Sequence, residues 1–141
     1  MTRIDFYVDA DDRVQVACRL AGKAFAQRLR VLVYAPEGDV AKAIDRVLWT
    51  TPAIGFVPHC MADHRLAAET PVVIARGADD APHDEVLVNL DHAWPPSFAR
   101  FQRLVEIVTR DEDDKRAARE RYRFYRDRGY PIHTHSLGGS G

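Results

Sequence analysis

Short, continuous apolar runs constrain the fold of this chain more than any other feature of its sequence. Residues 31–34 read Val-Leu-Val-Tyr, which leaves no charged side chain to face water. Strands of this kind are typical of a parallel sheet that is covered on both faces. We predict four further strands, and therefore a mostly parallel sheet of about five strands, with the additional ones over residues 4–8, 71–75, 85–89 and 104–108.

Helical periodicity separates several of these strands. Apolar residues recur every three or four positions over residues 17–25 and again over residues 40–49, which predicts two helices with one buried stripe each. Asp11 or Asp12 is positioned to cap the first of them, because a short carboxylate accepts hydrogen bonds from the free N–H groups of a first turn. The alternation of strand and helix is typical of a layered α/β fold.

A long third helix is predicted after the last strand. The acidic residues 111–114 suit a helix N-terminus, where the helix dipole favours negative charge, and Gly129 suits the C-terminal end. At 141 residues the chain has the size of one domain. We predict a single α/β domain over residues 1–130 and a flexible polar tail over residues 131–141.

The net charge of −1 conceals a strongly basic final helix. Residues 115–128 hold seven Lys or Arg and two Asp or Glu, a balance of +5, so the rest of the chain carries about −6. A general nucleic-acid-binding domain is usually basic throughout. A local basic cluster instead indicates recognition of one anionic group.

Other classes of protein are excluded by what the sequence lacks. No apolar run approaches the roughly 20 residues of a membrane helix, and residues 1–5 do not begin a secretion signal. The two cysteines, Cys18 and Cys60, are too few for a disulfide framework. These features favour a reducing, cytoplasmic location.

No cofactor or metal is expected from the sequence. The turn after the first strand reads Asp-Ala-Asp-Asp at 9–12, where a dinucleotide-binding fold needs glycines. The chain also has no phosphate-loop motif and no nucleophile motif of the Gly-x-Ser-x-Gly kind. His59, Cys60 and His64 match no common zinc spacing, so we interpret them as loop and core residues.

Four cations and one tyrosine share a stripe of the final helix. At 100° per residue they fall within an arc of about 100°, and they are Lys115, Arg119, Tyr122, Arg123 and Arg126. Like charges this close repel, so the stripe is either a solvated face or a site for an anionic ligand. Arginine presents a planar fork that suits a carboxylate, and the tyrosine adds an apolar wall. The combination favours a carboxylate beside an apolar group, such as a peptide C-terminus.

An apolar segment after the second helix admits two interpretations. Residues 48–59 include Trp49 and Phe56, and large aromatic residues often anchor protein partners. The same residues also suit a segment that covers the edge of the sheet. Composition alone favours that structural role.

Several motifs taken together resemble one protein family. They are Phe-Tyr at 6–7, Leu-Trp at 48–49 with Pro52 and Phe-Val-Pro-His at 56–59, Pro-Val at 71–72, Val-Leu-Val-Asn-Leu at 86–90, Ala-Arg-Glu-Arg-Tyr-Arg-Phe-Tyr-Arg at 118–126 and Gly-Tyr at 129–130. With these motifs the chain resembles the chi subunit of bacterial DNA polymerase III holoenzyme over nearly its whole length. The resemblance implies a three-layer α/β/α fold, similar to nucleotide-binding folds but without a phosphate-binding loop.

The resemblance also implies a function and two sets of binding residues. Chi is a non-catalytic adaptor in DNA replication. It connects the clamp loader, through the psi subunit, to the acidic C-terminal tail of single-stranded-DNA-binding protein, which ends in Pro-Phe. The positions that match the tail site are Lys115, Arg119, Tyr122, Arg123 and Arg126, with Val108 beside the pocket. The positions that match the psi-facing segment are Leu48, Trp49, Phe56, Val57, Pro58 and His59.

Two questions stay open at the level of sequence. The second partner is either a psi-like subunit or a protein that replaces it. The basic helix is either a peptide site or a direct binding surface for single-stranded nucleic acid, in which case naked oligonucleotide should bind. A degenerate nucleotide-dependent enzyme is a third hypothesis, which the missing phosphate loop disfavours. The family pattern assigns no role to His133 and His135.

Overall fold

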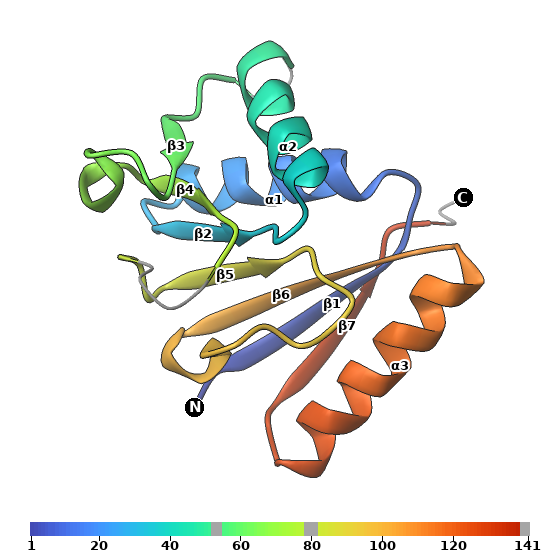
Figure 1. Ribbon diagram of the computed structural model, residues 1–141. Coiled ribbons are helices and arrows are strands. Elements are labelled where there is room, and N and C mark those ends of the chain that lie inside the picture. The colour runs from blue at the N-terminus through green and yellow to red at the C-terminus, as the bar shows by residue number, and fades with distance from the viewer. Residues whose placement is uncertain (52–54, 78–81, 139–141) are drawn as a thin grey trace.

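A seven-stranded sheet forms the centre of the molecule, in a computed structural model that describes residues 1–51, 55–77 and 82–138. The strands lie in the order β3-β4-β2-β5-β6-β1-β7, and every neighbouring pair is parallel (Figure 1). The strands are β1 (Arg3–Ala10), β2 (Val31–Tyr34), β3 (His59–Met61), β4 (Val72–Ala75), β5 (Val86–Asn89), β6 (Arg103–Thr109) and β7 (Ile132–Ser136).

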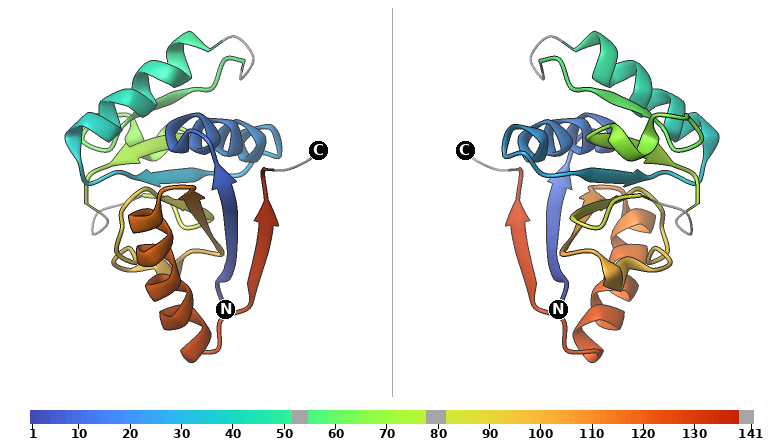
Figure 2. Two further views of the ribbon diagram at one scale, coloured as in Figure 1. Left: turned by 90° about the vertical axis from the view of Figure 1, so that its right-hand side faces the viewer. Right: turned by 90° about the vertical axis from the view of Figure 1, so that its left-hand side faces the viewer.

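Helices cover both faces of this sheet, so the α/β fold is confirmed and has three layers (Figure 2). Helices α1 (Arg13–Ala26) and α2 (Gly38–Thr50) pack on one face. Helix α3 (Glu112–Asp127) packs on the other. Short 3-10 helices lie at Ala67–Glu69 and Phe98–Arg100. In the described part of the chain, no helix has the length and apolar character needed to cross a membrane.

Alternation along the buried strands explains the three layers. Val31 and Val33 of β2 pack against α1 and α2, whereas Leu32 and Tyr34 pack on the side of α3. Successive side chains of a strand point to opposite faces, so this apolar strand fits where helices cover both faces. The strand predicted over residues 31–34 has the same bounds in the structure.

The sheet has seven strands where the sequence predicts about five. The two that the sequence does not predict, β3 and β7, are the two edge strands. β3 is three residues long and half-buried, and β7 reads Ile-His-Thr-His-Ser, so neither contains the apolar run that marks an interior strand. An edge strand pairs on one side only, and polar residues are common there.

The C-terminal segment differs from its prediction. The sequence predicts a flexible tail over residues 131–141, but β7 pairs in parallel with β1 from Ile4, opposite Ile132, to Val8, opposite Ser136. The backbone N–H of Leu137 also donates to the Val8 carbonyl. The predicted boundary at residue 130 therefore falls before the last strand of the folded unit. Residues 139–141 and Pro52 lie outside the described residues.

Side-chain caps fix where α1 and α3 begin. Asp12 Oδ1 accepts a hydrogen bond from the Gln15 N–H at 3.2 Å, and Asp111 Oδ2 accepts one from the Asp114 N–H at 3.1 Å. Such caps satisfy donors that have no partner within the first turn. Gly129 follows α3 with a φ of 81°, a left-handed conformation that glycine adopts without strain. The predicted start and end of the third helix are thereby confirmed.

Candidate functional site

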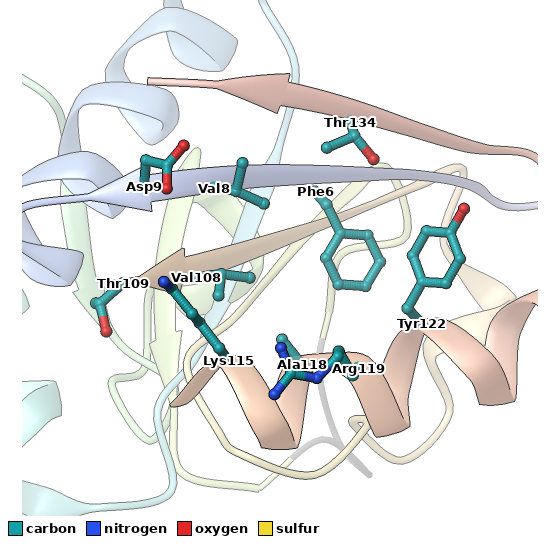
Figure 3. A pocket seen from close by; sticks show the side chains of 10 residues that line it. All are labelled: Phe6, Val8, Asp9, Val108, Thr109, Lys115, Ala118, Arg119, Tyr122 and Thr134. Atoms are coloured by element: carbon teal, nitrogen blue, oxygen red, sulfur yellow. The ribbon is translucent and has the colours of Figure 1, made fainter. Parts of the chain in front are cut away.

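A pocket of about 330 Å³ opens between α3 and the neighbouring edge of the sheet (Figure 3). Strands β1, β6 and β7 form one wall, and α3 forms the other. The lining residues are Phe6, Val8, Asp9, Val108, Thr109, Lys115, Ala118, Arg119, Tyr122 and Thr134. Four of the six residues predicted for the tail site are among them, namely Val108, Lys115, Arg119 and Tyr122.

The interior of the pocket is apolar. Phe6 and Val8 come from β1, Val108 comes from β6, and Ala118 comes from α3. The Phe6 ring lies 5.5 Å from the Tyr122 ring between centroids, with the ring planes 57° apart. Phe6, Val108 and Ala118 also belong to the buried core between the sheet and α3. The floor of the pocket is therefore continuous with this core.

Two cations of α3 stand at the rim of the pocket. Lys115 Nζ lies 3.7 Å from Glu112 Oε1, one turn earlier on the same helix. Arg119 is exposed, and no carboxylate or carbonyl among the described residues pairs with it. An exposed arginine without an ion-pair partner, beside an apolar hollow, can bind an anionic group of a ligand.

The other two cations of the predicted stripe lie outside the pocket. Arg123 Nη1 is 3.3 Å from Glu120 Oε1, and Arg126 Nη2 is 3.2 Å from Asp127 Oδ1. All four of these side chains are exposed, and such surface pairs contribute little free energy. Arg123 and Arg126 therefore extend the positive stripe toward the C-terminal end of α3 without lining the hollow itself.

Arg121 belongs to the charged run in the sequence but not to the charged surface. Its side chain is 2% exposed, and its Nε lies 3.0 Å from Glu106 Oε1 on β6. Glu106 also accepts hydrogen bonds from the Tyr125 hydroxyl at 2.5 Å and from the Asn89 amide at 3.1 Å. Burial raises the pKa of the Glu106 carboxyl, and Arg121 opposes that shift. The balance of +5 thus overstates the charge that α3 shows to solvent.

Asp114 holds the first turn of α3 beside the pocket. Its carboxylate lies 2.5 Å from Arg13 Nη2 of α1. It also accepts hydrogen bonds from the Thr109 N–H at 2.7 Å and the Thr109 hydroxyl at 2.9 Å. Burial raises the pKa of Asp114, but the bonds from Thr109 and Arg13 outweigh it, so the pKa lies below its ordinary value. Because Thr109 lines the pocket, Asp114 keeps part of the wall in place.

Apart from Val108, the strand residues that line the pocket are not predicted from the sequence. Lys115, Arg119 and Tyr122 were visible because one helical period relates them. The strand wall combines β1, β6 and β7, which lie far apart in the sequence. One signal was present, since alternation along residues 4–8 places Phe6 and Val8 on the same face of their strand.

The six residues predicted to face a psi subunit divide into core and surface. Leu48 and Val57 are 3% and 2% exposed and belong to the core. Trp49 and Phe56 are 61% and 72% exposed, and their ring centroids lie 6.2 Å apart. Pro58 and His59 are half-buried beside them, and the His59 ring lies 4.7 Å from the Trp49 ring. Only Trp49 and Phe56 offer a large apolar surface.

The two histidines considered as metal ligands make other contacts. His59 Nδ1 donates to the Val57 carbonyl at 2.7 Å, and its Nε2 lies 3.2 Å from Asp45 Oδ1. His64 Nδ1 accepts a hydrogen bond from the Leu66 N–H at 3.0 Å. Among the described residues, no three His, Cys, Asp or Glu side chains are grouped so that they could hold a metal ion.

Comparison with known proteins identifies the family. The chain matches the family model described as "DNA polymerase III chi subunit, HolC" over residues 1–133. It is 38% identical over 141 residues to the DNA polymerase III subunit chi of Pseudomonas aeruginosa, covering 97% of this chain and 98% of that protein. The subunit chi of Escherichia coli is 30% identical over 121 residues, covering 85% and 82%. That of Haemophilus influenzae is 29% identical over 125 residues, covering 88% and 87%.

The chain therefore belongs to the chi subunit family of DNA polymerase III. The resemblance inferred from the sequence motifs is confirmed. Chi is an accessory subunit of this polymerase and not a catalytic one, so the role of the chain in DNA replication is an accessory role.

Proposed function

We propose that this chain is an adaptor for the acidic C-terminal tail of single-stranded-DNA-binding protein and connects it, through a psi-like subunit, to the clamp loader. The observation that carries the proposal is an apolar pocket whose rim includes Arg119, a cation with no ion-pair partner among the described residues. A peptide that ends in an apolar ring and a free carboxylate matches both features. The proposed role implies a cytoplasmic location.

Each part of the pocket has a counterpart in such a peptide. The terminal phenyl ring fills the hollow beside Phe6 and Tyr122, where it removes apolar surface from water. The terminal carboxylate pairs with Arg119 in a charge-assisted hydrogen bond. The acidic residues that precede the ring follow the stripe toward Arg123 and Arg126.

These contacts predict moderate affinity that salt weakens. Exposed ion pairs contribute little individually, and screening at physiological ionic strength reduces them further. We expect a Kd in about the micromolar range for a single tail peptide. Several tails on one DNA-bound protein raise the effective affinity through avidity.

The second part of the proposal concerns the exposed aromatic pair Trp49 and Phe56. Large aromatic residues at the centre of an interface carry much of the binding free energy, and these two are mostly exposed while their neighbours Leu48 and Val57 are core. This pair belongs to the end of α2 and the segment after it, so it lies on the side of the sheet away from α3 (Figure 1). A psi-like subunit on this side leaves the pocket open.

Direct binding of nucleic acid is the alternative, and the charges on α3 disfavour it. Arg116, Arg123 and Arg126 each lie near a carboxylate of the same helix. Binding to a phosphate backbone depends on cations that are available to neutralise phosphates. Mixed charge of this kind suits a short acidic peptide, held mainly by one pocket, better than a nucleic-acid strand.

Titration calorimetry tests the tail proposal. The probe is a synthetic acidic peptide ending in Pro-Phe, and the matched control is the same peptide without its final Phe. We expect the first to bind, more weakly at moderate than at low salt, and the second to show no measurable binding. Equal binding of the two peptides, or binding of a naked oligonucleotide but neither peptide, would overturn the proposal.

A further inference from the structure

We propose that the C-terminal strand β7 is a functional wall of the peptide pocket, with Thr134 as a contact residue and with His135 and Ser136 as positioning residues. The inference rests on the proposed function of the pocket and adds an element to it. It assigns a role to the His-Thr-His-Ser segment at 133–136, for which the family pattern has none. Thr134 lines the pocket itself, and Ser136 contacts Asp9, another lining residue.

Thr134 is the residue of β7 that faces the pocket. It is among the lining residues, and Figure 3 shows it on β7, the strand next to β1 on the side opposite β6. Ile132, two residues earlier on the same strand face, packs against the core between the sheet and α3. The position of Thr134 therefore depends on how firmly β7 is held against β1.

His135 anchors the opposite face of the same strand. Its Nε2 donates to Asp5 Oδ1 at 2.9 Å, and Asp5 has a fully buried side chain on β1. The His135 ring also stacks on Tyr7, 4.7 Å between centroids and 20° between planes. Arg103 on β6 completes the group, with its Nε 2.8 Å from Asp5 and its Nη2 2.7 Å from the Tyr7 hydroxyl. One side chain of β7 thus joins a cluster that spans three strands.

Ser136 anchors the end of β7 next to the pocket. Its hydroxyl donates to Asp9 Oδ2 at 2.9 Å. Asp9 lines the pocket and has a φ of 62°, at the point where the register between β1 and β6 shifts. A non-glycine residue adopts this conformation only where its surroundings hold it. The Ser136 hydroxyl is one of the contacts that hold it.

These side-chain anchors add to the backbone pairing of β7 with β1 and to the packing of Ile132. It is an edge strand with one neighbour, and three of its five residues are exposed. Edge strands with few buried side chains are among the elements that open most readily. Binding and strand pairing are thermodynamically linked. A ligand that contacts Thr134 therefore stabilises the pairing of β7 with β1, and a change that loosens this pairing lowers the affinity for the ligand.

The test compares two histidines on one face of β7. His135→Ala removes the anchor on Asp5, and His133→Ala is the matched control, because His133 is exposed and makes no side-chain hydrogen bond among the described residues. The probe is the acidic peptide ending in Pro-Phe, titrated by fluorescence anisotropy. We expect His135→Ala to weaken binding by about fivefold or more and His133→Ala to change it by less than about twofold. His135→Gln, which can still donate to Asp5, should restore most of the affinity.

A second pair keeps the inference testable if His135→Ala lowers stability. Thr134→Glu and His133→Glu add the same charge to the same strand on opposite faces, and only the first should weaken peptide binding. Hydrogen exchange adds a readout that a purely structural role does not predict, because saturating peptide should slow exchange of the β7 amides. Equal affinity of wild type, His135→Ala and Thr134→Glu would overturn this inference alone. No peptide binding by the wild type would overturn the proposed function, and this inference with it.

Discussion

At the scale of single residues, the arginines of α3 have two distinct roles. Arg121 is buried with Glu106 and Tyr125, and this cluster attaches α3 to β6. Breaking a buried ion pair leaves a charge without a partner, which costs several kcal/mol. Arg119 is two residues earlier, exposed, and free of ion pairs in the described part of the chain. One arginine fixes the helix so that the other can meet a ligand.

Because of Asp114, we expect the stability of the folded protein to fall as the solution becomes acidic. Its pKa in the folded state lies below the ordinary value of 3.8, so the folded protein binds this proton less tightly than the unfolded chain does. The stabilisation is complete above about pH 5 and is lost as the pH falls toward the folded-state pKa. We expect Asp114→Asn to lower the free energy of unfolding by about 1–2 kcal/mol at pH 7 and by less at pH 3, measured by urea unfolding.

A neighbouring carboxylate provides the control for this measurement. Asp113 is exposed and pairs with Arg116 one turn later, an arrangement that contributes little. Asp113→Asn should therefore change the free energy of unfolding by less than about 0.5 kcal/mol at either pH. A loss in Asp114→Asn that is the same at pH 7 and pH 3 would contradict the role assigned to this carboxylate.

At the scale of elements, the sequence predicts the interior strands of the sheet better than its two edge strands. Strand β2 and helix α3 were predicted close to their observed bounds because an apolar run and a capped charged helix are local signals. β3 and β7 were missed because their polar or short sequences carry no such signal, and their pairing depends on β4 and β1. A strand of this kind is recognised only when its neighbour is already in place.

The candidate site shows the same division. The stripe of Lys115, Arg119 and Tyr122 follows from helical period, and these three residues do line one pocket. Phe6, Thr109 and Thr134 complete the wall through parallel strands brought together by long connections. Spacing along the chain does not reveal that convergence. Nor does it reveal that Arg121, within the same charged run, is buried.

At the scale of the whole molecule, the sheet separates the two proposed binding surfaces. The pocket lies on the α3 side, and α2 lies on the other side (Figures 1 and 2). Trp49 belongs to the last turn of α2, and the Phe56 ring packs beside it. The proposed adaptor role requires such an arrangement, because both partners must bind at once.

This separation predicts that the two activities can be removed independently. Phe56→Ala removes a ring that is 72% exposed, so stability should change little. We expect docking of a psi-like subunit, measured by surface plasmon resonance, to weaken by about tenfold or more, while affinity for the tail peptide stays within about twofold. Leu66→Ala, at another exposed apolar residue, is the control. Loss of both activities in Phe56→Ala would contradict two separate sites.

The most direct test of the central claim is a charge reversal at the rim of the pocket. Arg119→Glu and Arg116→Glu make the same change in net charge at two exposed positions of α3, but of these two only Arg119 lines the pocket. In a titration with the acidic peptide ending in Pro-Phe, we predict that Arg119→Glu weakens binding by more than about tenfold. Arg116→Glu should weaken it by no more than about threefold, through its long-range charge alone. Equal loss in the two variants, or wild-type affinity in Arg119→Glu, would contradict a peptide site in this pocket.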